Sequence, residues 1–162
     1  MFGTAHADTA DEVLVNWDRL KKIEKAQTTQ TDVLRSVPRN LPSLTMAYKV
    51  QKKAANVGFD WDCAADALCK ITEEAEELKA AMAGSGDVRE ELGDLLFSAV
   101  NVARLLKADP ELQLRAATDK FIARFAQMEA LAAQQGRRLE QMTLAEMDAL
   151  WENAKKVRNN GK

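Results

Sequence analysis

Acidic side chains concentrate in one short part of this 162-residue chain. Of its 25 Asp and Glu residues, eight fall between residues 73 and 94, where an even distribution would place about three. Glu74 and Glu77 are three positions apart, and so are Glu91 and Asp94. Residues at this spacing share one face of an α-helix. Each pair therefore presents two carboxylates on one side of its helix, a pattern suited to binding a metal ion.

The helices that carry these pairs are expected over residues 62–83 and 87–107, with Gly84-Ser85-Gly86 as the turn between them. In an antiparallel hairpin, Glu74 and Glu91 lie about 70° and 80° to the same side of the apolar stripes of their helices. Counted from the turn, the two pairs stand about 14 Å and 11 Å along their helices. The four carboxylates are therefore expected to converge beside the helix interface.

Converging carboxylates repel one another unless they are protonated or neutralised by a cation. Mg²⁺ prefers oxygen ligands and often shares its coordination with substrate phosphates, and Mn²⁺ is the alternative ion. The chain has one histidine, His6 near its start, so zinc is disfavoured. The alternative to a metal site is a solvated acidic surface, in which Lys70, Lys79 and Arg89 pair with the acids. The matched spacing on both helices favours the metal site.

The composition predicts an all-α fold, because residues with high helix propensity dominate and only 7 Gly and 3 Pro interrupt them. Short connections predict an antiparallel helical bundle, and we expect a homodimer to complete its core. The polar stretch 27–32 is predicted to be a linker, Asp62 to cap a helix, and Thr143 with Glu146 to form a capping box. The helices are expected at residues 9–25, 43–56, 62–83, 87–107, 110–135 and 143–157.

The formal net charge of −2 gives the chain no basic field that would attract nucleic-acid polymers or anionic membranes. No apolar run approaches the roughly 20 residues that span a bilayer, and residues 1–13 lack the features of a signal peptide. Cys63 and Cys69 point to different helix faces, and two lone thiols fit a reducing compartment. We therefore expect a cytoplasmic protein with neither a nucleic-acid polymer nor a membrane as partner.

The two acidic motifs, EEAEE at 73–77 and EELGD at 90–94, resemble the EExxE…ExxD signature of the all-α nucleoside triphosphate pyrophosphohydrolases. LPSLTMAYKVQKKAANVGFDW at 41–61 is similar to the MazG branch of that superfamily in particular. The resemblance covers residues 41–157 in the expected order. Its further segments are EELGDLLFSAVNVARLL at 90–106, KFIARF at 120–125, and Trp151 with Lys155.

This resemblance implies a Mg²⁺-dependent dimer that hydrolyses NTPs or dNTPs to monophosphate and pyrophosphate, in the service of nucleotide-pool sanitation. Water would attack the α-phosphorus, with Glu73 or Glu74 as the proton acceptor. By motif position, the implied metal ligands are Glu74, Glu77, Glu91 and Asp94, with Glu73 and Glu90 as their helpers.

The resemblance also implies contacts with the nucleotide. Lys120 and Arg124 would meet the triphosphate, and the turn around Trp61 lies near the nucleotide in relatives. Asn101, one helix face along from Asp94, is a further candidate to contact the base. The remaining implied substrate contacts are Trp151 and Lys155.

In domain terms, residues 1–40 are expected to form an N-terminal helix and connector, 41–158 the catalytic domain, and 159–162 a frayed tail. The first forty residues resemble the connector that precedes the C-terminal domain of longer two-domain MazG proteins. The chain is therefore expected to correspond to that C-terminal catalytic domain.

Several of these residues have a simpler explanation. Trp151 is in step with apolar helix positions, so it can pack in a core. Trp61 can staple the helix that follows it, and Asn101 can fill a polar gap. Lys120 and Arg124 suit a solvated surface. Two rival functions remain open: a narrow dUTP, dCTP or phosphoribosyl-ATP pyrophosphohydrolase, and a non-catalytic helical module that binds a basic partner.

Overall fold

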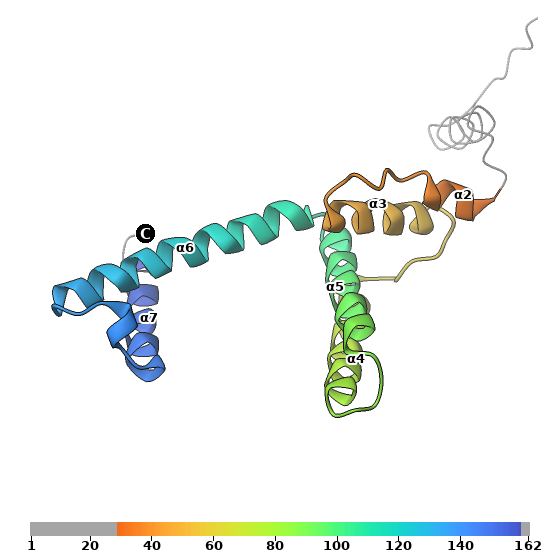
Figure 1. Cartoon of the computed structure of the whole chain (residues 1–162). Helices are drawn as coiled ribbons and strands as arrows, with labels where there is room; N and C mark the ends of the chain where they lie inside the picture. Colours follow the sequence, from red (N-terminus) through yellow and green to blue (C-terminus); the bar gives the residue numbers. More distant parts are fainter. Residues whose placement is uncertain (1–28, 160–162) are drawn as a thin grey trace, which may run out of the picture. The chain divides into compact units, whose positions relative to one another are not determined.

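The computed structural model describes the backbone of residues 29–159 and the side chains of residues 29–155. Within this range it contains six α-helices, one 3₁₀ helix and no strand, which confirms the predicted all-α class (Figure 1). None of the described helices is long and apolar enough to cross a membrane. The predicted helix at 9–25 and most of the predicted tail at 159–162 lie outside the described residues.

The chain divides into two compact units, residues 1–110 and 111–162. The described part of the first unit contains α2 (Gln30–Arg35), α3 (Ser43–Ala55), α4 (Ala64–Met82) and α5 (Val88–Leu105). Helices α4 and α5 pack against each other as a hairpin, α3 packs on α5, and α2 packs on α3 (Figure 1). The α4–α5 hairpin is therefore the framework on which the acidic motifs lie.

The turn between α4 and α5 depends on glycine. Gly84 and Gly86 have φ angles of 103° and 136°, a region that residues with a Cβ rarely adopt. Asp87 then caps α5, because its carboxylate accepts a hydrogen bond from the Arg89 backbone N–H at 2.8 Å. Helix α4 begins later than predicted, since Cys63 rather than Asp62 stands at its N-cap.

The interpretation of residues 27–32 as a linker was wrong for its described part, because α2 begins at Gln30. Thr29 and Asp32 form a capping box: the Asp32 N–H donates to Thr29 Oγ1 at 3.1 Å, and the Thr29 N–H donates to Asp32 Oδ2 at 2.8 Å. Polar residues that suggest a loop here satisfy the free N–H groups of a helix terminus.

The second unit contains α6 (Pro110–Gln134), the 3₁₀ helix η1 (Leu139–Gln141) and α7 (Leu144–Asn159). The predicted capping box at α7 is confirmed, with Thr143 N–H donating to Glu146 Oε2 at 2.7 Å. A small apolar core joins the two long helices. Its buried members are Met128, Ala132 and Leu150, with Leu131, Leu139, Met142, Met147 and Trp151 packed against them.

Candidate metal and nucleotide site

The structure brings three of the four predicted metal ligands together. Glu74 on α4 and Glu91 and Asp94 on α5 each offer a carboxylate oxygen, and these oxygens lie within 4.8 Å of one another. Glu77 is not a member of this group, although it lies close enough to affect Glu91 electrostatically. The hairpin thus produces the convergence that the helical spacing predicted, with Glu77 outside the closest cluster.

Burial and mutual repulsion act on these carboxylates. Glu74 is only 5% exposed, whereas Glu91 is half-buried and Asp94 is exposed. Loss of hydration raises the pKa of Glu91, and the neighbouring charges of Glu77, Asp94, Glu74 and Glu90 raise it further. The cluster therefore carries more negative charge than its surroundings balance. Three oxygen donors without nitrogen or sulfur fit a hard divalent cation.

Lys70 supplies the nearest positive charge. Its Nζ lies 2.7 Å from Glu74 Oε1 and 2.8 Å from Glu73 Oε1, and these two contacts raise the pKa of Lys70. The pairing proposed under the acidic-surface alternative is thus real for Lys70, as it is for Lys79, which lies 3.2 Å from Glu76. Lys70 differs in that it contacts a buried acid of the carboxylate cluster. The sequence pattern predicted Lys70 only as a surface partner of the acids and gave no sign of this contact with a buried carboxylate.

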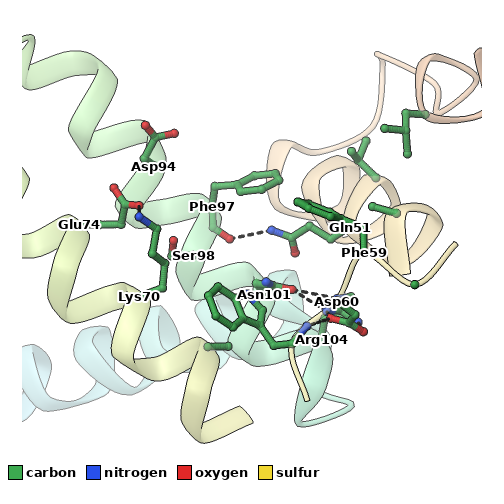
Figure 2. Close-up of a pocket in the computed structure, with 16 residues that line it drawn as sticks. Gln51, Phe59, Asp60, Lys70, Glu74, Asp94, Phe97, Ser98, Asn101 and Arg104 are labelled. Atoms are coloured by element: carbon green, nitrogen blue, oxygen red, sulfur yellow. Dashed lines mark hydrogen bonds and ion pairs between the residues drawn. The ribbon is translucent and has the colours of Figure 1, made fainter. Parts of the chain in front are cut away.

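A cavity of about 650 Å³ adjoins the cluster. Figure 2 shows Lys70, Glu74 and Asp94 on one side of it and Gln51, Phe59 and Asp60 on the other. A volume of this size is typical of small-molecule sites. The other residues that line it are Leu34, Val50, Ala54, Gly58, Trp61, Ala67, Phe97, Ser98, Asn101 and Arg104.

A polar network closes the side of the cavity away from the carboxylates. The Arg104 guanidinium donates to both carboxylate oxygens of Asp60, with Nη1 to Oδ2 at 3.0 Å, and to Asn101 Oδ1 at 3.0 Å from Nε and 2.7 Å from Nη2. The Arg104 contact lowers the pKa of Asp60. This network ties the GFDW turn to α5. Because Asp60 and Arg104 are 44 residues apart, no local pattern in the sequence predicted it.

Two predicted nucleotide contacts, Asn101 and Trp61, line this cavity. Their role in binding stays a prediction. Asn101 is half-buried, and its oxygen is already engaged by Arg104. Trp61 is 43% exposed, so the structure does not make it a buried staple.

The other four predicted contacts belong to the second unit. Lys120 is exposed, and Lys155 pairs with Glu152 at 2.5 Å. The Arg124 guanidinium lies 6.0 Å from the centre of the Trp151 ring. Trp151 also packs against the apolar core of the second unit. The core interpretation of Trp151 is therefore supported, while the phosphate contacts of Lys120 and Arg124 stay predictions.

Comparison with known proteins agrees with the predicted resemblance. Residues 65–128 match the MazG nucleotide pyrophosphohydrolase domain. The chain is 37% identical over 160 residues to the nucleoside triphosphate pyrophosphohydrolase of Escherichia coli K12, covering 96% of the chain and 61% of that protein. It is 42% identical over 139 residues to the nucleoside triphosphate pyrophosphohydrolase/pyrophosphatase MazG of Thermotoga maritima, covering 86% of the chain and 54% of that protein. A third relative is the protein YabN of Bacillus subtilis. The chain is 41% identical to it over 160 residues, which cover 97% of the chain and 32% of that protein.

The helical architecture and the carboxylate groups on one hairpin agree with these matches to nucleotide pyrophosphohydrolases. The chain is thus similar to proteins of the MazG type, and its residues 65–128 are the part that matches the MazG domain. It spans 54–61% of the length of the Escherichia coli and Thermotoga maritima relatives.

Proposed function

We propose that this chain hydrolyses nucleoside triphosphates to nucleoside monophosphate and pyrophosphate. The observation that carries the proposal is the convergence of Glu74, Glu91 and Asp94 beside a cavity of nucleotide size, within a domain of the MazG type. The names of the Escherichia coli and Thermotoga maritima relatives support the same activity.

We further propose Mg²⁺ as the cofactor, with Mn²⁺ as a substitute. Glu74, Glu91 and Asp94 would hold it, and we retain Glu77 as a fourth ligand because its charge already acts on Glu91. When bound, the cation would offset phosphate charge and lower the pKa of a coordinated water. A substrate-bound ion would also relieve the repulsion that raises the pKa of Glu91.

The remaining steps fall to the side chains. Glu73, which is exposed and paired with Lys70, is proposed to accept the proton of the attacking water, with Glu74 as the alternative acceptor. Attack at the α-phosphorus expels pyrophosphate. Lys120 and Arg124 on α6 are proposed to offset the charge of that leaving group.

The test is product analysis on eight NTPs and dNTPs with Mg²⁺, with and without added inorganic pyrophosphatase. Orthophosphate that appears only with pyrophosphatase supports the proposal. Orthophosphate without it would indicate attack at the γ-phosphorus and a different enzyme class. Activity confined to dUTP or dCTP would favour a pyrophosphohydrolase of narrow specificity. Absence of turnover on every substrate would favour a non-catalytic helical module.

Metal binding has its own readout, which does not depend on turnover. Mg²⁺ should raise the Tm of the parent chain, because it binds only the folded carboxylate cluster. In Glu91→Gln this increase should disappear, whereas the Tm without metal should rise as repulsion falls. Glu76→Gln, which changes an exposed acid paired with Lys79, should keep the Mg²⁺ effect. Equal Mg²⁺ shifts in Glu91→Gln and the parent would contradict the ligand assignment.

A further inference from the structure

Gln51 on α3 is a buried polar side chain with one half of its amide unpaired. It is 6% exposed, and its Nε2 donates to the Phe97 backbone carbonyl at 2.8 Å. Its Oε1 is buried and has no hydrogen-bond partner among the described residues. A buried acceptor without a donor destabilises the folded state, so such groups usually have a partner.

The orientation of this amide is fixed by its neighbour. The Phe97 carbonyl can only accept, so the amide cannot turn over without opposing two oxygens. Gln51 therefore presents an acceptor to the cavity that it lines. In Figure 2 its oxygen points away from the Phe97 carbonyl, toward the side where Asn101 and Asp60 lie.

A second amide in the same wall is also fixed. Asn101 Oδ1 accepts two hydrogen bonds from Arg104, which Asp60 holds in place. This contact turns the Asn101 amide nitrogen, a donor, away from Arg104. The rings of Phe59, Trp61 and Phe97 line the same cavity. The wall opposite the carboxylates therefore combines a fixed acceptor, an amide donor and aromatic surfaces.

We propose that this wall is the nucleobase site and that Gln51 Oε1 accepts an N–H from the edge of the base. The inference rests on the proposed function, in which Glu74 and Asp94 mark the phosphate end of the same cavity. Adenine offers its 6-amino group, cytosine its 4-amino group, guanine N1–H, and uracil and thymine N3–H. One fixed acceptor therefore admits every standard base and disfavours a base edge without an N–H donor.

The sharpest probe is purine riboside 5′-triphosphate, which is ATP without the 6-amino group. In the parent chain, kcat/KM for ATP should exceed that for this analogue by about 10-fold to 100-fold, because the analogue leaves the acceptor unpaired. In Gln51→Met, which keeps the side-chain volume and removes the acceptor, the two values should agree within about 3-fold. Gln134→Met, at an exposed position of α6, should retain the parent's ratio.

The ratio separates recognition from folding. If Gln51 is only structural, Gln51→Met lowers both values by the same factor and the preference for ATP persists, which overturns the proposal. Equal values in the parent would also overturn it and would mean that a water satisfies Gln51.

Binding measurements separate this proposal from the proposed function. By calorimetry, the parent should bind AMP about 10-fold more tightly than purine riboside 5′-monophosphate, and Gln51→Met should bind both equally. If the parent prefers AMP but does not turn over triphosphates, the proposed hydrolase activity is rejected and the proposed base site is retained. Equal affinities in the parent would reject the base site.

Discussion

At the scale of single residues, Glu74 combines burial with two opposed electrostatic contacts. Lys70 neutralises it at 2.7 Å, while Glu91 and Asp94 approach it from the neighbouring helix. A buried carboxylate is retained only where a partner compensates for lost hydration. Lys70 provides that compensation, so Glu74 keeps its position beside Glu91 and Asp94.

The carboxylates should differ sharply in their effect on turnover. We expect Glu74→Gln, Glu91→Gln and Asp94→Asn each to lower kcat/KM by about 100-fold or more, since each removes a charged ligand of the cluster. Steady-state kinetics with saturating Mg²⁺ measure this. Glu76→Gln is the matched control, because Glu76 is exposed, pairs with Lys79 and lies outside the carboxylate cluster. An inactive Glu76 variant beside a fully active Glu91 variant would contradict the assignment.

Residue spacing predicted the carboxylate cluster because helical periodicity and one short turn are enough to define it. The same reasoning did not identify Arg104 or Gln51. Gln51 contacts Phe97, 46 residues away, and such long-range pairs leave no periodic trace. One signal was present in the sequence: Gln51 is in step with Leu44, Tyr48 and Ala55, so it is a polar residue on the inner face of its helix.

At the scale of helices, capping residues determined which boundaries were predictable. Thr143 and Glu146 were identified as a capping box and form one, whereas Thr29 and Asp32 form the same motif in a stretch interpreted as a linker. The difference lies in length, because α2 has six residues and shows too little apolar periodicity to be distinguished from a loop.

Glu146 should make the stability of the α6–α7 hairpin depend on pH. The hydrogen bond from Arg137, helped by those from Thr143, lowers the pKa of Glu146 to about 2 from an ordinary value of 4.5. A lowered pKa means that the ionised group stabilises the fold. This contribution is present above pH 4.5 and is lost as the pH falls toward 2.

The measurement is urea unfolding of the parent and Glu146→Gln at pH 7, 4 and 2.5. We expect the parent to be the more stable at pH 7 and the difference to shrink at pH 2.5. Glu140→Gln is the control, because Glu140 is exposed and its contact with Arg138 is 3.8 Å. A difference between the parent and Glu146→Gln that stays constant with pH would show that the Arg137 contact has no effect on stability.

At the scale of the whole molecule, the first unit leaves large apolar side chains exposed on both helices of its hairpin. Leu68 on α4 and Leu92 and Leu96 on α5 are 54%, 47% and 53% exposed. Exposed apolar side chains on adjacent helices are typical of a protein–protein interface. This supports the predicted homodimer, in which a second hairpin would cover these residues.

Sedimentation equilibrium at micromolar concentration should therefore give twice the chain mass. Leu96→Glu should shift the equilibrium to monomer, because it places a charge in the covered face. Gln134→Glu introduces the same charge at an exposed position of α6 and should leave the mass unchanged. A parent chain that sediments as a monomer would contradict the dimer.

Lys120 and Arg124 would make the second unit contribute to catalysis if they bind the triphosphate. Lys120 and Arg124 are one helical turn apart on α6, so both can face the same phosphate chain. Lys120 is exposed, whereas Arg124 is half-buried, has a buried Nε without a partner among the described residues, and lies beside Trp151. Comparing kcat/KM and Tm in variants of these two residues should therefore distinguish a catalytic role of α6 from a structural one.

Lys120→Ala should lower kcat/KM by about 10-fold to 1,000-fold with an unchanged Tm, because an exposed lysine contributes little to folding. Arg124→Ala should lower both quantities, since it also removes the contact with the Trp151 ring. Arg124→Lys keeps the charge but loses the planar guanidinium, so we expect partial recovery of activity. Parent-like kinetics in Lys120→Ala, beside an Arg124→Ala variant whose activity falls only in proportion to its Tm, would assign α6 a structural role.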